Sequence, residues 1–268
     1  MEKNNKAVNI LYKLLSNPPP DVDLTLVGGG ALILWINFYR KHYPENFDTL
    51  RLAGTKDIDF ITLKEDVYKC YKHWGGKLSV PDIDHATPEI AILCINPESE
   101  NTVEIDFLQD LIGISRTESL KEREPILGFS DRGCIYFLNE IMVLMNRVMN
   151  TLSLSKYQNT HAYDQIFNAM AVVKSAIMAK FDTDDHKGAT RLAHKALKMA
   201  HSRKIGINLY VNFGIDLLNA VPVPSNNLNY TEQFTTIAQP KFLHEIHERR
   251  KSTIKHLKKR GQQAQKWW

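Results

Sequence analysis

The chain is 268 residues long, with 43% hydrophobic and 24% charged residues, a composition typical of a globular protein that can bury one or two cores. Its three cysteines lack C-x-x-C spacing, which argues against a disulfide framework or zinc site and favours a reducing compartment. No apolar run approaches the roughly 20 residues of a membrane span, and no signal peptide is visible. We therefore expect a cytoplasmic protein that does not associate with a membrane.

The first half of the sequence predicts a small mixed β-sheet with helices. Residues 7–16 indicate an amphipathic helix, which ends before three prolines. A strand at 24–27, a buried helix at 31–39 and an acidic strand at 55–60 follow. After them the pattern predicts a helix at 66–74 and a hairpin of strands at 89–95 and 102–108.

The second half predicts helices. Apolar spacing indicates helices over residues 135–152, 163–181, 189–204 and 242–260. The predicted fold class is therefore α+β, with a small mixed β-sheet domain over residues 1–125. An α-helical domain is predicted over residues 126–268, ending in a basic helix.

Two aspartates one residue apart, Asp57 and Asp59, form the most informative pattern in the chain. Side chains at i and i+2 of a strand point to the same face, whereas Ile58 and Phe60 would point to the other, buried face. Two carboxylates on one face repel each other unless a positive charge lies between them. A divalent metal ion is the natural neutralising partner, because hard cations take oxygen ligands.

A third carboxylate is available at Asp106, in the predicted strand 102–108. Its apolar neighbours Ile105 and Phe107 would be buried. Glu104 lies on the same face, and an alternative interpretation makes Glu104 and Asp106 the solvated face of an edge strand. Paired metal ions held by such carboxylates are a common means of nucleotidyl transfer.

Three glycines, Gly28, Gly29 and Gly30, lie between the first strand and the buried helix, which predicts a strand-to-helix turn. Without Cβ atoms the backbone can approach a ligand, and the helix N-terminus offers unpaired N–H groups to an anion such as a triphosphate. A dinucleotide-binding G-x-G-x-x-G/A turn is the rival interpretation, but it would place the large Ile33 at the last position. A P-loop is excluded because G-x-x-x-x-G-K-[ST] is absent.

These motifs carry a resemblance to a known family. Val27-Gly28-Gly29, Asp57-Ile58-Asp59 and Ile105-Asp106-Phe107 resemble, in this order, the hG[GS]…DhD…hDh signature of the DNA-polymerase-β-like nucleotidyltransferase superfamily. Within it, residues 26–32 and 55–60 are most similar to the AbiEii branch, which includes bacterial toxins of abortive-infection and toxin–antitoxin systems. The resemblance covers about residues 20–110.

The resemblance implies transfer of a nucleoside monophosphate from an NTP to an acceptor hydroxyl, with release of pyrophosphate. We expect three carboxylates to hold two Mg²⁺ ions and five residues to contact the nucleotide phosphates. The predicted metal and catalytic residues are Asp57, Asp59 and Asp106, and the predicted nucleotide-binding residues are Gly28, Gly29, Gly30, Thr55 and Lys56.

The acceptor is expected to be RNA, with tRNA the first choice, and an antitoxin protein is an expected partner. Residues 241–268 support a nucleic-acid partner, because they hold nine Lys or Arg against two Glu. The alternatives are a solvated basic helix face, a small-molecule adenylyltransferase of the aminoglycoside type, and a catalytically silent binding module of the same fold.

Overall fold

The computed structural model describes residues 2–52, 55, 57–81, 88–96, 102–126, 134–223 and 230–259, with the backbone alone for residues 2–6. The chain divides into two compact units. The first holds Met1–Phe38 and Leu52–Arg147, and the second holds Tyr39–Arg51 and Val148–Trp268. The predicted domain division at residue 125 stays a prediction, although the first compact unit extends beyond it.

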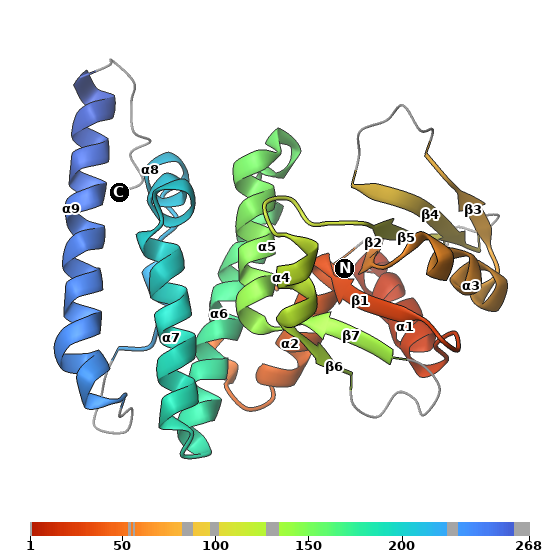
Figure 1. Cartoon of the computed structure of the whole chain (residues 1–268), viewed down its shortest axis with the longest axis horizontal. Coiled ribbons are helices and arrows are strands. Elements are labelled where there is room, and N and C mark those ends of the chain that lie inside the picture. Colours follow the sequence, from red (N-terminus) through yellow and green to blue (C-terminus); the bar gives the residue numbers. More distant parts are fainter. Residues whose placement is uncertain are drawn as a thin grey trace. The chain divides into compact units, whose positions relative to one another are not determined.

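The first unit is built on one sheet, in which the described strands have the order β3-β4-β5-β2-β1-β7-β6. The fold class is α+β, as predicted (Figure 1). The strands are β1 (Asp23–Val27), β2 (Asp57–Ile61), β3 (Lys77–Ser79), β4 (Glu89–Ile95), β5 (Val103–Leu108), β6 (Arg123–Pro125) and β7 (Cys134–Leu138). The helices that begin in this unit are α1 (Glu2–Ser16), α2 (Gly28–Tyr39), α3 (Lys64–Trp74), α4 (Arg116–Lys121) and α5 (Glu140–Ser153).

Mixed pairing brings the two acidic strands together at the centre of the sheet. β2 pairs parallel with β5, and antiparallel with β1 on its other side. The predicted hairpin is present as the antiparallel pair β4 and β5. The two strands that carry the acidic motifs are therefore neighbours, although more than forty residues separate them in the sequence.

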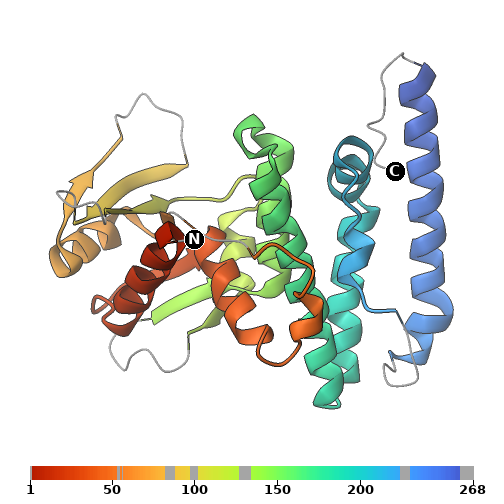
Figure 2. The same ribbon diagram turned by 180° about the vertical axis from the view of Figure 1, so that it is seen from behind.

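One face of the sheet is the core of the first unit. Phe60 and Phe107 stack across β2 and β5, with ring centroids 6.5 Å apart, and Trp74 of α3 lies 6.1 Å from Phe60. Both phenylalanines are fully buried, as is Leu11 of α1. Figure 2 shows α1 and α2 in front of this face. Because side chains alternate along a strand, the aspartates of β2 and β5 lie on the opposite face.

The predicted helix over 135–152 is wrong at its start. Residues Cys134–Leu138 form β7, which pairs parallel with β1, and α5 begins only at Glu140. Asn139 ends the strand and caps the helix, since its side-chain oxygen accepts a hydrogen bond from the backbone N–H of Met142 at 3.1 Å. Trp35 of α2 holds β7 in place, donating to the carbonyl of Leu138 at 2.9 Å.

The second unit is helical. Its long helices are α6 (Thr160–Asp182), α7 (His186–His201) and α9 (Gln239–Lys259), close to their predicted ranges. The shorter elements are α8 (Asn208–Phe213), the single turns η1 (Pro44–Asn46), η2 (Ser155–Tyr157) and η4 (Leu217–Ala220), and the π-helical turns η3 (Arg203–Ile207) and η5 (Phe234–Ala238). Among the described residues, no helix is long and apolar enough to cross a membrane.

The segment Tyr39–Arg51 belongs to this helical unit, although it follows α2 in the sequence. Asn46 donates to the hydroxyl of Ser175 on α6 at 2.9 Å, and Asn168 of the same helix donates to the carbonyl of Arg51 at 2.8 Å. Tyr43 donates to the carboxylate of Asp182 at 2.5 Å. The segment is therefore fixed along α6 by side chains at both of its ends.

Candidate metal centre

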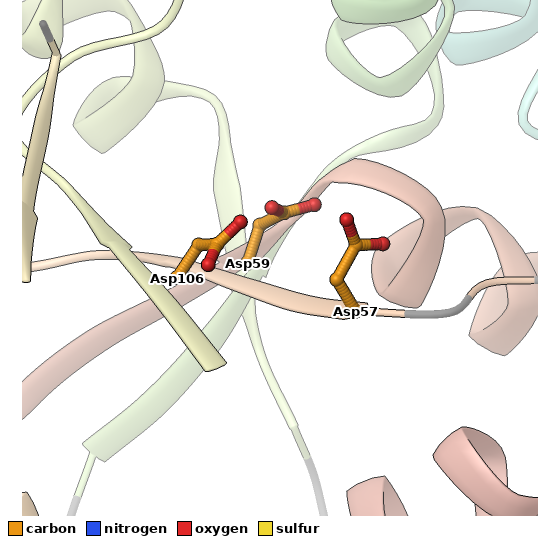
Figure 3. A group of neighbouring side chains, drawn as sticks. All are labelled: Asp57, Asp59 and Asp106. Atoms are coloured by element: carbon orange, nitrogen blue, oxygen red, sulfur yellow. The ribbon is translucent and has the colours of Figure 1, made fainter. Parts of the chain in front are cut away.

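The three predicted carboxylates lie together. Asp57 and Asp59 extend from β2, and Asp106 from β5, where it stands opposite Asp59 in the parallel register. Each offers one carboxylate oxygen, and these three oxygens all lie within 4.8 Å of one another. Figure 3 shows the three side chains on the same side of the two strands. The i, i+2 spacing and the strand register together produce the cluster.

Glu104 shares the face of Asp106 and stands opposite Asp57 in the register. Its side chain is exposed, whereas Asp106 is half-buried. Among the described residues, the group of acidic side chains close enough to share an ion consists of Asp57, Asp59 and Asp106 without Glu104.

The surroundings of Asp106 raise its affinity for a proton. Burial, the largest cause, and the negative charges of Asp59 and Asp57 together raise the pKa of the Asp106 carboxyl to about 7, with smaller effects of Glu89 and Glu104. A carboxyl with this pKa is partly protonated at neutral pH. Asp106 is therefore poised to exchange a proton near physiological pH, and a cation bound beside it would favour its ionised form.

The donor set fits Mg²⁺. Two oxygens on one Mg²⁺ ion, each roughly 2.1 Å from it, lie at most about 4.2 Å apart. The separations in the cluster, up to 4.8 Å, are close to this span. They also suit a pair of ions about 3.5–4 Å apart that share a carboxylate ligand. Asp57, Asp59 and Asp106 could thus hold a divalent metal ion without a change of backbone.

Gly28 is placed against the cluster. α2 begins directly at Gly28, so the three glycines form the first turn of the helix. The sequence had predicted a separate turn, followed by a helix that begins at residue 31. Gly28 has φ +65°, and a Cβ atom added there would lie 1.8 Å from Oδ2 of Asp59. Only glycine leaves room for this carboxylate, and the N-terminus of α2 consequently faces the acidic cluster.

The other two glycines are buried in the same turn. A Cβ atom at Gly30 would lie 3.0 Å from Cδ1 of Leu26, so this glycine allows α2 to pack closely on β1. Gly29 lies between them. Their contact with nucleotide phosphates stays a prediction.

Thr55 supports the acidic strand. It is buried, and its hydroxyl donates to the backbone carbonyl of Asp57 at 2.7 Å and lies 3.4 Å from Oδ1 of the same residue. This geometry orients Asp57, a role that the sequence did not indicate. The predicted phosphate contact of Thr55 stays a prediction, and Lys56 lies outside the described residues.

A cation that the sequence did not single out lies on the same face of the sheet, at Arg123 of β6. Its guanidinium donates to both carboxylate oxygens of Asp23 and, at 3.0 Å, to the hydroxyl of Thr25. It also lies 3.8 Å from the ring centroid of Tyr136. With these partners Arg123 joins the edge strand β6 to β7 and β1.

The known proteins that match this chain resemble it distantly. No family model matches the sequence, and no curated protein matches it. Two solved structures from Helicobacter pylori are similar at 13% identity. One is JHP933, at a TM-score of 0.39, over 98% of this chain and 99% of the other. The second is described as a "putative nucleotidyltransferase", at a TM-score of 0.37, over 94% and 97%. Such distant likeness does not assign the chain to a family.

Proposed function

We propose that this protein is a metal-dependent nucleotidyltransferase that moves a nucleoside monophosphate from an NTP to an acceptor hydroxyl. The cluster of Asp57, Asp59 and Asp106 carries this proposal, because its three oxygens lie within 4.8 Å of one another on one face of the sheet. The N-terminus of α2 adjoins the cluster at Gly28. A carboxylate cluster beside helix N–H groups suits a metal–triphosphate ligand.

The side chains have distinct proposed roles. Asp57 and Asp59 would hold Mg²⁺, and Asp106 would share it. When bound, Mg²⁺ neutralises the charge of the triphosphate and stabilises the charge that develops during transfer. Thr55 keeps the carboxylate of Asp57 oriented through its hydrogen bond to the Asp57 backbone.

The reaction joins the acceptor oxygen to the α-phosphorus of the NTP and breaks the bond from that phosphorus to the oxygen of the leaving pyrophosphate. The acceptor hydroxyl must lose its proton. Asp106 is the proposed proton acceptor, because it lies on the same face as the other metal ligands and a bound cation would favour its ionised form, which can accept a proton.

The proposed acceptor is RNA, with tRNA the first choice. The order of the three motifs and the AbiEii-like stretches around Gly28 and Asp57 support this acceptor, and with it a role as a toxin controlled by an antitoxin protein. The described part of α9 supports it too, with exposed Lys251, Lys255, Lys258 and Lys259.

The test is a transfer assay with each α-³²P-labelled NTP, Mg²⁺ and total RNA. Wild-type protein should label RNA in a reaction that EDTA stops. Asp57→Ala and Asp59→Ala should each lower the rate at least about a hundredfold, as loss of one charge-stabilising group does elsewhere. Glu104→Gln, the matched control on the same face, should cost far less.

Each alternative outcome has a distinct meaning. Transfer at the wild-type rate by either alanine variant would contradict the metal assignment. Label that appears on an aminoglycoside and not on RNA would identify the small-molecule enzyme. NTP binding without any transfer would identify the silent binding module.

A further inference from the structure

The solvent face of α7 consists of basic side chains. Its four exposed residues are all Lys or Arg, namely Lys187, Arg191, Lys195 and Lys198, which we call the basic stripe. The helix contains no Asp or Glu. Like charges at i, i+4 destabilise a helix by about 0.2–0.5 kcal/mol per pair, so this pattern is unfavourable for the helix by itself.

The stripe is straight. At 100° per residue, its four members fall within an arc of about 80°, and they cover a rise of about 16 Å along the axis. Neighbouring charges of the stripe are three or four residues apart, about 4.5–6 Å along the axis, so the stripe offers a row of positive charges to a row of phosphates. The length and spacing of the stripe therefore suit the phosphodiester backbone of a nucleic acid.

Packing fixes the direction in which the stripe points. Small and apolar residues such as Leu192, Ala193 and Ala196 bury the opposite side of α7. On one flank, the ring of His194 lies edge-on to that of Phe242 of α9, with centroids 5.2 Å apart, and Nε2 of His201 lies 2.7 Å from Oε2 of Glu245 on α9. α7 and α9 lie side by side in both views of the chain (Figures 1 and 2). The helix cannot rotate to hide its charges without losing these contacts.

A groove with both polar and apolar lining begins where α7 ends, its apolar lining residues being Ile207, Val211 and Leu257. It has a volume of about 470 Å³ and lies between η3 and α8 on one side and α9 on the other. Its polar lining comprises Arg203, Asn208, Asn212, Ser252, Thr253 and His256. Amide, hydroxyl and guanidinium groups of this kind hydrogen-bond the phosphate and sugar oxygens of nucleic acids.

We propose that the basic stripe and this groove bind the phosphodiester backbone of RNA. The inference rests on the proposed function in one respect, the assignment of the RNA as the acceptor. The exposed face of α7 offers no apolar side chain. A membrane-bound helix buries Trp, Phe or Leu in the lipid, and a protein interface is centred on aromatic or apolar anchors. Both are disfavoured here.

The test measures binding of a fluorescein-labelled RNA hairpin by fluorescence anisotropy over a range of salt concentrations. It uses the full chain carrying Asp57→Ala and no NTP, so that transfer plays no part. The stripe variant replaces all four basic residues with Gln. Its RNA affinity should fall at least tenfold at low salt, and the salt slope should fall by about 3, since each phosphate contact contributes about 0.7–0.9.

A control variant removes the same charge from exposed lysines elsewhere, by Lys41→Gln, Lys64→Gln, Lys72→Gln and Lys121→Gln. It should keep most of the affinity and slope. A charge-preserving variant with Lys187→Arg, Lys195→Arg and Lys198→Arg should bind as the parent does, which separates charge from folding. In the groove, Asn212→Ala with Ser252→Ala should weaken binding without changing the slope.

Equal affinity and slope for the stripe and control variants would overturn the inference. So would binding to phosphatidylserine vesicles that RNA does not displace. The two proposals fail separately. RNA binding that depends on the stripe, in a protein that transfers no nucleotide, would refute the proposed function alone. Nucleotide transfer to RNA with stripe-independent binding would refute this inference alone.

Discussion

Replacement of Asp106 by asparagine should stabilise the metal-free protein while abolishing its activity. Burial and the charges of Asp59 and Asp57 raise the pKa of Asp106 from 3.8 to about 7. Because this pKa is higher in the folded than in the unfolded chain, the folded chain retains the proton between about pH 4 and pH 7. The contribution of Asp106 to the stability of the folded chain is therefore most favourable below about pH 4, and it is lost as the pH rises from about 4 to 7. Asparagine, which has no charge to bury, avoids this loss.

The magnitude follows from the size of the shift. A pKa difference of about 3 units corresponds to about 4 kcal/mol. Asp106 is half-buried, so water screens part of this energy, and we expect a gain of about 1–2 kcal/mol for Asp106→Asn at pH 8. At pH 5, where the wild-type carboxyl is already protonated in the folded chain, the gain should be smaller.

Urea unfolding in EDTA, at pH 5 and pH 8, measures both values. Trp35 and Trp74 lie in the first unit, so their fluorescence reports on that unit once Trp267 and Trp268 are replaced by Phe. Saturating Mg²⁺ should reverse the order by stabilising the wild type more than the variant, by about 2.7 kcal/mol at a hundredfold excess over Kd. Glu104→Gln, at an exposed position, should change little. An Asp106→Asn protein that is less stable than wild type at pH 8, or equally stabilised at both pH values, would refute the reasoning.

Two further substitutions test the packing around the site and in the helical unit. Gly28→Ala should lower the Mg²⁺ affinity measured by calorimetry, because the added Cβ would lie 1.8 Å from Oδ2 of Asp59 and the backbone φ of +65° favours glycine. Gly30→Ala should lower this affinity less, because its Cβ would meet the end of the Leu26 side chain at 3.0 Å and not a carboxylate. Arg250→Met should destabilise the helical unit by about 3–5 kcal/mol in thermal unfolding, because it leaves the carboxylate of Asp216 without its partner. In the folded chain, buried Arg250 donates to both carboxylate oxygens of Asp216. A change below about 1 kcal/mol would contradict a structural role for this pair.

The sequence predicted the acidic cluster because short-range rules determine most of it. Alternation along β2 places Asp57 and Asp59 on one face, and apolar neighbours indicate the same for Asp106. The parallel pairing of β2 with β5 is long-range, and only the motif order pointed to it. Helices with a clear apolar period, such as α6 and α7, were predicted within a few residues of their ends.

The errors lie where local patterns are ambiguous. The apolar run at 134–138 suits either a strand or a helix, and its partner β1, more than a hundred residues earlier, decides for the strand. Similarly, the local sequence of Tyr39–Arg51 does not indicate to which unit the segment belongs. Its place in the helical unit depends on hydrogen bonds such as the one from Asn46 to Ser175, which no local rule anticipates.

The charge state of Asp106 was beyond prediction for a different reason. Alternation indicates which face a carboxyl occupies, but its pKa depends on how deeply that face is buried and on how near the other charges come. Here the helix N-terminus at Gly28 approaches Asp59 so closely that no side chain fits between them. The i, i+2 spacing on β2 and the register with β5 bring the three carboxylates within 4.8 Å of one another. Without a cation, one proton relieves their repulsion near pH 7, and a bound metal ion would displace that proton. Metal affinity and proton affinity at this site are therefore two consequences of one geometry.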